Sequence, residues 1–439
     1  MLRRIFASVP PRSSRGIARI LTAAILAAAA LPLYAQVPET SLPPAKGEYE
    51  HTLPPGPPDN PYAIPDLPPR SQLAPDQSGD WLTWSFILSA LYDYTALNQD
   101  TDAESQVGKV DNQGEVRDLR LILHGTMGHD YKVGYYWAAS YKGFDNAPGT
   151  TWALDDASLS FPLATPATSL TVGKTKETFG YEVIGDAASL AQQERVMNFW
   201  TVSRSTGAKV TQVVGDAQFM TISAGVFNDG WGKGKTEGYD YTGRVSGLLW
   251  DKDDGKSFMH VAIAARYSEA TDGVIRYAGR PETNIGPNYI DTGNLPANHS
   301  TAVALEALWN QGPYSILSEY THARVDSPAT GNPQFGGYYV LGSWVLTGET
   351  RPYDRTVGYD RRIIPTGRWG AFELVARFSH ENLDDGTVHG GEYDKTYVGL
   401  NWWATTRWKF GAGWGHIWLD RYGKTGNTDD FLTRLQWVF

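Results

Sequence analysis

The sequence contains no cysteine, which excludes disulfides, thiolate zinc sites, iron–sulfur clusters and a lipidated N-terminal cysteine. Long apolar runs are also lacking. The longest, residues 20–33, is too short to span a bilayer comfortably as a helix. No segment after residue 81 keeps a convincing helical period. Stability must therefore come from strand pairing and packing, and no helix of the mature chain is expected to cross a membrane.

The motifs of common hydrolases and metalloenzymes are absent as well. No G-x-S-x-G elbow occurs, the nine histidines are scattered, and none forms an H-E-x-x-H pair. An outer-membrane hydrolase would need a nucleophile beside an oriented histidine, so we predict no enzyme. We also predict no metal, no cofactor and no nucleic-acid partner. A soluble β-rich binding protein or adhesin remains a third class, distinguished by staying in the aqueous fraction after membrane separation.

Aromatic residues are abundant although the mean hydropathy is negative. The chain has 13% aromatic residues, including 16 Trp and 24 Tyr. Aromatic girdles around a membrane barrel give this combination. The net charge by itself does not favour anions. The sequence has 38 basic residues, five of them within the first 35 positions, and 48 acidic ones. Any preference for anions must then depend on where the arginines lie.

The N-terminal region divides into two segments. Residues 1–35 predict an export signal, with a basic region free of acids, the apolar run and "LYA" before Gln36. Residues 36–79 are rich in proline without an apolar period, which predicts an extended or disordered linker. The basic residues of the export signal are Arg3, Arg4, Arg12, Arg15 and Arg19. Residues 80–439 form a third predicted region, whose residue pattern differs from that of the linker.

From Trp81 onward, runs with period-two character alternate with clusters of Gly, Asp, Asn and Pro. Sixteen such runs predict an all-β, antiparallel transmembrane barrel. Most connectors alternate between short and long, as at the two rims of such a barrel. The long ones are expected at 95–114, 177–204, 269–300 and 419–429, and 348–368 is long where a short turn is due. The expected strands are 81–94, 115–126, 131–141, 151–161, 168–176, 205–214, 217–228, 238–250, 257–268, 301–310, 313–323, 337–347, 369–379, 394–403, 406–418 and 430–439.

The last segment, "FLTRLQWVF", alternates between a mostly apolar face and a face with Arg434 and Gln436. One alternative is an edge strand of a soluble sheet. In a barrel, this strand must instead pair with the first one, because a closed sheet has no free edge. We expect Phe439 to serve as the signal for the barrel-assembly machinery.

Alternation also assigns several strand faces. Apolar residues occupy every second position in "GRVSGLLW", "FELVARFS", "RDLRLILHG" and "HVAIAARYS". A charge facing lipid at the midplane would cost roughly 2 to 4 kcal/mol, so the polar positions must face the lumen. Each arginine there either lines a pathway or pairs with a lumen acid such as Glu306, Glu319 or Glu373. The lumen residues predicted in this way are Asp118, Arg120, His124, Arg244, His260, Arg266, Glu373 and Arg377.

Several blocks, in order, resemble the outer-membrane phosphate-selective porins O and P. They include "TSLTVGKTKETFG", "RPETNIGPNYIDTG", "ALEALWNQGPYSILSEY", "GYYVLGSWVLTGETRPY" and "GAFELVARFSHENLDDG", and the resemblance covers nearly all of 81–439. It implies a sixteen-stranded barrel in the outer membrane of a Gram-negative bacterium. It also implies a homotrimer whose third external loop, 177–204 here, folds inward.

The resemblance further implies passive diffusion of anions, inorganic phosphate or polyphosphate, past basic residues, with outer-membrane lipid around the barrel. The alternative is a general or differently selective pore for small polar solutes. One departure from the family is Arg117-Asp118, where members often carry two arginines. The candidate anion-binding or pore-lining residues are Arg120, Lys174, Lys176, Arg195, Arg276 and Arg280, together with Arg244, Arg266 and Arg377 from the alternation.

Overall fold

The computed structural model describes residues 77–78, 81–141, 152–163, 167–200, 202–215, 218–228, 230, 234–253 and 255–439. The predicted signal (1–35) and nearly all of the predicted linker (36–79) lie outside them. At the end of the linker range, β1 (Gln77–Ser78) pairs with Thr83 and Trp84. No helix in the described part is long and apolar enough to cross a membrane.

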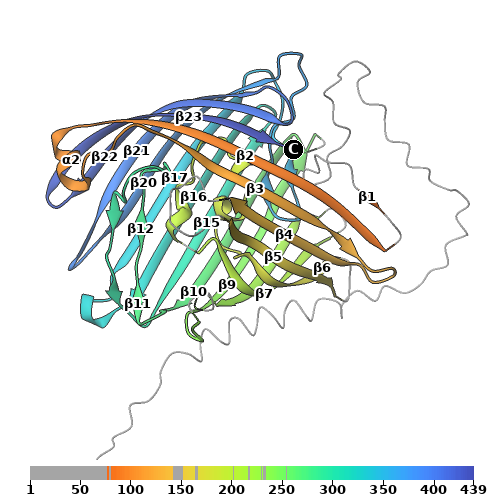
Figure 1. Cartoon of the computed structure of the whole chain (residues 1–439), viewed down its shortest axis with the longest axis horizontal. Helices are drawn as coiled ribbons and strands as arrows, with labels where there is room; N and C mark the ends of the chain where they lie inside the picture. Colours follow the sequence, from red (N-terminus) through yellow and green to blue (C-terminus); the bar gives the residue numbers. More distant parts are fainter. Residues whose placement is uncertain are drawn as a thin grey trace, which may run out of the picture. The chain divides into compact units, whose positions relative to one another are not determined.

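Sixteen antiparallel strands of the described chain form a closed barrel, as predicted (Figure 1). The first nine follow one another along the wall, and every strand pairs with its neighbours in sequence. The strands are β2 (Leu82–Gln99), β3 (Gln113–Met127), β4 (Val133–Tyr141), β5 (Trp152–Pro162), β6 (Thr168–Lys176), β7 (Arg204–Val214), β8 (Met220–Asn228), β9 (Tyr239–Lys252), β10 (Ser257–Glu269), β15 (His299–Gln311), β16 (Tyr314–Asp326), β17 (Gln334–Val345), β20 (Ala371–Asp385), β21 (Val388–Trp403), β22 (Trp408–Arg421) and β23 (Lys424–Val438).

The barrel closes between its first and last strands. β2 pairs with β23 from Ser89 opposite Val438 to Gln99 opposite Thr428. Beyond β23, Leu88 and Phe439 exchange two backbone hydrogen bonds, each 2.8 Å long. The predicted partnership of the first and last segments is therefore confirmed, and the wall has no free edge at this seam.

The two faces of the wall follow the predicted alternation. In β20, Leu374 and Phe378 are exposed on the outer face, whereas Glu373 and Arg377 are buried inside. Outward aromatic rings stack on neighbouring strands, as in the pair Phe372 and Trp402, whose ring centroids are 6.1 Å apart. The outside is thus apolar with aromatic contacts, which suits lipid.

The prediction of a long loop at 419–429 is wrong. β22 continues to Arg421 and β23 begins at Lys424, with only Tyr422 and Gly423 between them. Both turn residues have positive φ, 56° and 70°, as a two-residue hairpin turn requires. The error arose because β23 begins with residues 424–430, which are polar on both faces, so its apolar alternation starts later than the strand does.

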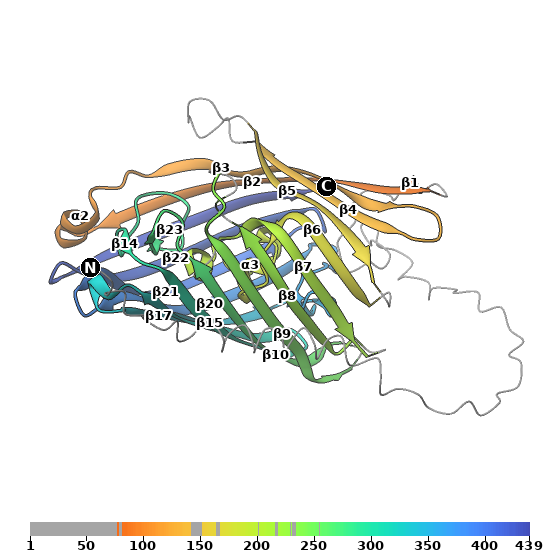
Figure 2. The same ribbon diagram turned by 90° about the horizontal axis from the view of Figure 1, so that it is seen from below.

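Three connectors contact the inner face of the barrel, through the pairs Thr178–Thr242, Tyr277–Ser300 and Arg351–Glu373. Figure 2 shows α3, from the first of them, among the strands of the wall. Residues 177–203 contain α3 (Tyr181–Ile184), η2 (Ala187–Ser189) and η3 (Met197–Trp200). Residues 270–298 contain β11 (Val274–Ile275), β12 (Ala278–Gly279), β13 (Ile290–Asp291) and β14 (Leu295–Pro296). Residues 346–370, the connector predicted to be long at a place where the alternation calls for a short turn, contain β18 (Tyr353–Asp354) and β19 (Tyr359–Asp360). Two short helices lie at other connectors, α2 (Thr101–Val107) and η5 (Pro328–Thr330).

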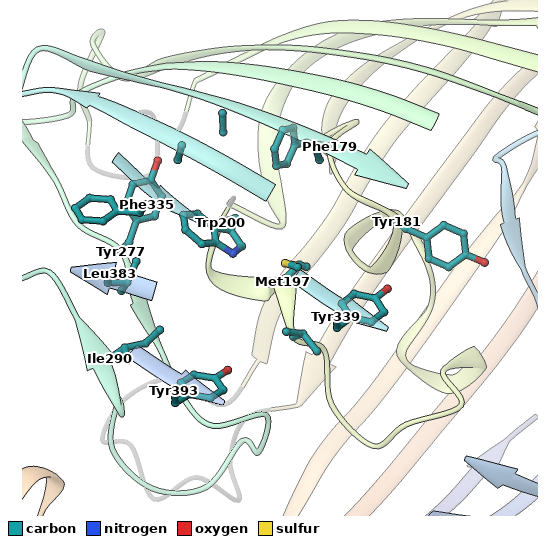
Figure 3. Packing of buried hydrophobic residues seen from close by; sticks show 14 of the residues in the cluster. Phe179, Tyr181, Met197, Trp200, Tyr277, Ile290, Phe335, Tyr339, Leu383 and Tyr393 are labelled. Carbon is teal, nitrogen blue, oxygen red and sulfur yellow. The ribbon is translucent and has the colours of Figure 1, made fainter. Parts of the chain in front are cut away.

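These connectors build a hydrophobic core inside the barrel. Trp200 and Tyr181 from 177–203 and Tyr277 from 270–298 pack with inward residues such as Tyr339 and Tyr393 (Figure 3). The inward residues of this core come mainly from β10, β15–β17 and β20–β23. One side of the lumen is therefore filled by side chains.

Candidate functional site

A cavity of about 950 Å³ occupies the other side of the lumen. Its walls are β2 to β9, and residues 175–189 and 356–362 close its inner side. Thr126, Ala167 and Gly215 also line it, so it reaches the barrel end that carries the short connectors after β3, β5 and β7. We call it the vestibule. Its hydroxyl lining consists of Thr83, Ser89, Thr126, Ser158, Ser160, Ser169, Thr171, Thr175, Thr178, Ser189, Thr211, Thr221, Ser223 and Thr356.

Cations outnumber carboxylates around the vestibule, although the chain as a whole is acidic. Seven basic side chains line it against four acidic ones. Low-dielectric walls focus the electric field of such a local excess of positive charge, so the vestibule attracts anions despite the net charge of −10. The basic residues are Arg120, Lys176, Arg204, Lys209, Arg244, Arg361 and Arg362, and the acidic ones are Asp118, Asp156, Glu177 and Asp186.

Three of the predicted site residues line the vestibule. Arg120 lies at β3 and donates to Asp155 at 2.9 Å. Lys176, the last residue of β6, donates to the carbonyl of Gly185 at 2.7 Å. Arg244 of β9 is already held, since it donates to both carboxylate oxygens of Glu306 at 2.9 and 2.6 Å. Arg244 therefore mainly fixes the wall, whereas Arg120 and Lys176 keep part of their surface exposed.

Two further predicted residues face the lumen but lie outside the vestibule. Arg266 contacts Glu177 at 2.8 Å and Asp240 at 3.0 Å. Arg377 forms an ion pair with Glu282 and is also buried. These two arginines neutralise Glu177 and Glu282 on the connectors, and Arg266 also neutralises Asp240 on β9, which is the alternative role considered for lumen arginines.

Arg195 holds the connector 177–203 together from within. Its Nε and Nη2 donate to the carbonyls of Glu182 and Gly185 at 2.6 and 3.0 Å. Burial lowers its pKa, although the nearby Glu194 charge opposes this shift. Within the described residues, no carboxylate lies within 4.0 Å of its guanidinium. Arg195 is thus a cation that no direct ion pair neutralises.

The remaining three predicted residues are not brought to the vestibule. Arg276 is exposed and forms a bidentate pair with Asp291, at 2.8 and 2.5 Å. Arg280 is also exposed and donates to the carbonyl of Asn284 at 2.7 Å. Lys174 shares the outer face of β6 with Val172.

Sequence reasoning missed four basic residues of the vestibule. Lys209 and Arg204 lie on β7, where Lys209 alternates with the outward Ala208 and Val210, so the pattern could have revealed Lys209. Arg361 and Arg362 lie in the connector 346–370. No sequence signal showed that this connector reaches the lumen, because its residues have no period that indicates a direction.

Asp186 joins the two connectors that close the vestibule. It accepts a hydrogen bond from the Tyr359 hydroxyl at 2.8 Å and lies 3.1 Å from Arg361 and 3.7 Å from Lys176. Burial would raise its pKa, but the charges of Lys176 and Arg361 outweigh burial and hold the pKa well below its usual range. A permanent carboxylate therefore ties these cations together.

Arg362 has the greatest freedom among the cations of the vestibule. Its one hydrogen bond within the described chain goes to the Thr406 carbonyl at 3.3 Å. Burial lowers its pKa to about 10, so it stays charged at neutral pH. Its remaining N–H donors could bind an oxyanion.

The family model for phosphate-selective porin O and P matches residues 91–439. The chain belongs to this family. It is therefore an outer-membrane porin of a Gram-negative bacterium. A curated relative, Porin O of Pseudomonas aeruginosa, is 24% identical over 361 residues, which cover 73% of this porin and 80% of that protein.

Solved structures show the same fold at low identity. The outer-membrane channel DcaP of Acinetobacter baumannii matches with a TM-score of 0.53 and 11% identity, covering 83% of this porin and 100% of that chain. OmpT of Vibrio cholerae matches with a TM-score of 0.52 and 12% identity, with the same coverage. Another OmpT structure, described as a trimer form, has a TM-score of 0.50 and covers 82% of this porin and all of that chain.

Proposed function

We propose that this porin lets small anions, phosphate or polyphosphate, diffuse passively across the outer membrane. The observation that carries the proposal is the excess of cations among the hydroxyl groups of the vestibule. Family membership supports it independently, since the family is described as phosphate-selective. The porin needs no cofactor and performs no catalysis in this role.

Passage would depend on weak, repeated binding. Guanidinium and ammonium groups replace part of an anion's hydration, and the fork of arginine fits two oxygens of one phosphate. Serine and threonine hydroxyls can donate or accept, so they hold the anion between cations. Because each contact is weak, the anion can leave again. Arg362 is the best placed residue for this relay, whereas Lys176 already donates to the carbonyls of Ile184 and Gly185.

We place the constriction where the connectors 177–203 and 346–370 meet. Besides the Asp186 contacts, the Tyr181 hydroxyl donates to Asp360 at 2.5 Å and Arg351 donates to the Ser189 carbonyl at 2.8 Å. In this proposal, 177–203 is the inward-folded third external loop. The connector 346–370 then narrows the same passage from the end with the short connectors.

The second candidate is a general or differently selective porin. Asp118 and Asp156 face the vestibule, and an acid follows Arg117 where the family often has a second arginine. Arg117 itself is occupied by Glu194, at 2.5 Å. These carboxylates weaken a phosphate path on the β3 side, so a broader range of small polar solutes would pass.

Single-channel recording in planar bilayers tests both candidates. We expect the reversal potential in asymmetric potassium chloride to show anion preference, and added inorganic phosphate to block the chloride current. Anion preference without block would favour the second candidate. Cation preference would overturn the role of the vestibule cations.

Three further partnerships belong to this proposal. The porin assembles as a homotrimer in outer-membrane lipid, in line with the trimer form of a structural relative. Phe439 presents the C-terminal signal to the barrel-assembly machinery. Residues 1–35 direct export and 36–79 form a linker ahead of the barrel.

A further inference from the structure

Two aromatic rings stand side by side on the wall of the vestibule. His124 of β3 and Tyr136 of β4 are cross-strand partners, and both line the vestibule. Their ring centroids lie 5.9 Å apart at an interplanar angle of 25°, so the rings are stacked. His124 therefore covers one face of the Tyr136 ring, and the opposite face, which we call the open face, points toward β5.

Small residues follow Tyr136 on the side of its open face. Its partner on β5 is Ser158, and the partner of Ser158 on β6 is Gly173. Ser158 lines the vestibule, and Gly173 lies at the alternate position between Thr171 and Thr175, which also line it. A short hydroxyl side chain and a residue without a side chain leave space beside the ring. A pair of rings that only stabilised the sheet would need no such space.

Three cations of the vestibule gather beyond this space, on β6 and β7. Lys176 and Arg204 are cross-strand partners at one end of these strands. The Lys209 Nζ donates to the Lys176 carbonyl at 3.0 Å, which brings its ammonium group to the same place. Asp156 and Asp186 neutralise part of this charge, at 2.7 Å from Arg204 and 3.7 Å from Lys176. Neighbouring strands lie about 4.8 Å apart, so two or three strand spacings, about 10 to 14 Å, separate β4 from the strands of the cations.

The vestibule is larger and richer in hydroxyl groups than the passage of inorganic phosphate alone requires. Its volume of about 950 Å³ is that of a pocket for a drug-sized molecule. Its serine and threonine side chains can donate to or accept from the hydroxyls of a solute. An inorganic phosphate ion has no apolar face to pack on an aromatic ring. A sugar, in contrast, carries C–H groups on its faces and hydroxyls around its edge.

We propose that the vestibule binds sugar phosphates. The sugar ring packs on the open face of Tyr136, its hydroxyls bond to serine and threonine side chains such as Ser158, and its phosphate lies beside Lys209 and Arg204, with the charge of Lys176 nearby. Tyr136 is then the residue that distinguishes phosphorylated sugars from inorganic phosphate. Such binding rests on the proposed passage of anions and adds a class of solute for the same site. Each contact stays weak, as release from a channel requires.

Current block in planar bilayers tests this class of solute. Glucose 6-phosphate and inorganic phosphate are added in turn to the wild-type porin in potassium chloride, and the half-blocking concentration of each is measured. We expect glucose 6-phosphate to block at a concentration about three- to tenfold lower, because it gains one contact with an aromatic ring. Equal half-blocking concentrations would overturn the proposal. Stronger block by adenosine monophosphate than by glucose 6-phosphate would also overturn it, since the ring would then serve a nucleobase.

Variants at Tyr136 give a second readout. Tyr136→Leu should remove the advantage of glucose 6-phosphate over inorganic phosphate, whereas Tyr136→Phe, which keeps the ring, should retain it. Tyr338→Leu is the matched control and should also retain the advantage, because Tyr338 is 38% exposed on the outer face of β17. Persistence of the advantage in Tyr136→Leu, or its loss in Tyr338→Leu, would contradict the assignment.

The same recordings separate the two proposals. Absence of block by inorganic phosphate in the wild type would count against the proposed phosphate passage, even where glucose 6-phosphate blocks. Block by both solutes at the same concentration would leave the phosphate passage intact and overturn the sugar site alone.

Discussion

The two halves of the barrel wall carry similar residues on the outer face and different residues on the inner face. Both present apolar residues to the exterior, but the inner face of β2 to β9 carries mainly serine, threonine and a few cations. The inner face of β15 to β23 carries tyrosine, leucine and paired charges that pack on the connectors. Small hydroxyl side chains leave space for a solute, whereas large rings and ion pairs remove it. The size of the inward side chains, more than their polarity, therefore determines which side of the lumen stays open.

Glu373 gives the strongest test of the filled side. It is fully buried and accepts hydrogen bonds from Arg351, Ser343, Asn401 and Trp403. Glu373→Leu should destabilise the barrel by about 3–5 kcal/mol, because the buried Arg351 loses its bidentate carboxylate and keeps only Asp360, 3.6 Å away, as an acidic partner among the described residues. Urea unfolding in detergent micelles would measure this loss.

The double variant Arg351→Met with Glu373→Leu should recover part of that stability, because the buried guanidinium is removed together with its carboxylate, whereas Asp360 loses its ion pair with Arg351. Lys235→Ala, which breaks an exposed pair with Asp272, is the control and should cost about 1 kcal/mol or less. If Glu373→Leu were as mild as this control, the filled side would not hold the connectors in place.

Arg362 tests the open side. Removing one positive charge at about 6 Å in water raises the energy of an anion and lowers that of a cation by about 0.7 kcal/mol each, a difference of about 1.4 kcal/mol or roughly tenfold in preference. Arg362→Met should therefore lower the anion-to-cation permeability ratio about tenfold, as measured by reversal potentials, and leave stability unchanged. Arg368→Met, an exposed arginine in the same connector, is the control. A smaller effect at Arg362 than at Arg368 would show that anions bypass this wall.

The smallest effect concerns pH. Burial opposes the charge of Glu194, but Arg117 and Arg434 outweigh burial and lower its pKa to about 2, from an ordinary value of 4.5. Its stabilising contribution is thus fully present above about pH 4.5 and is lost as the pH falls toward 2. The difference in melting temperature between the wild type and Glu194→Gln should stay constant from pH 7 to 4.5 and shrink below it. A difference that grows on acidification would contradict this assignment.

The wall of the barrel could be predicted from the sequence, and much of the interior could not. Period-two alternation located all sixteen strands and the inward direction of Arg244, Arg266 and Arg377, because lipid imposes the pattern on every strand. Partners such as Glu177 and Glu282 come from connectors, where no repeating environment imposes a pattern. Arg361 and Arg362 were missed for the same reason.

Lys174 marks a limit of another kind. Its basic side chain and the motif around it suggested that Lys174 is a pore residue. Its position in the in–out alternation of β6 places it on the outer face instead. The outward direction follows from counting alternate positions along β6 from Thr171, which needs only the order of the residues. Motif resemblance identified the family, whereas strand parity places Lys174 outside; Lys176 has the same parity but reaches the vestibule because β6 ends there.

The seam between β2 and β23 has a consequence for biogenesis. Asp93 and Arg434, 2.7 Å apart across it, are separated by 341 positions in the chain. During synthesis, β2 emerges early and then waits with one unpaired edge, which is prone to aggregation, until the last strand has been exported. Such long-range closure is slow, so the edge of β2 stays open to aggregation for most of the time that the barrel takes to assemble.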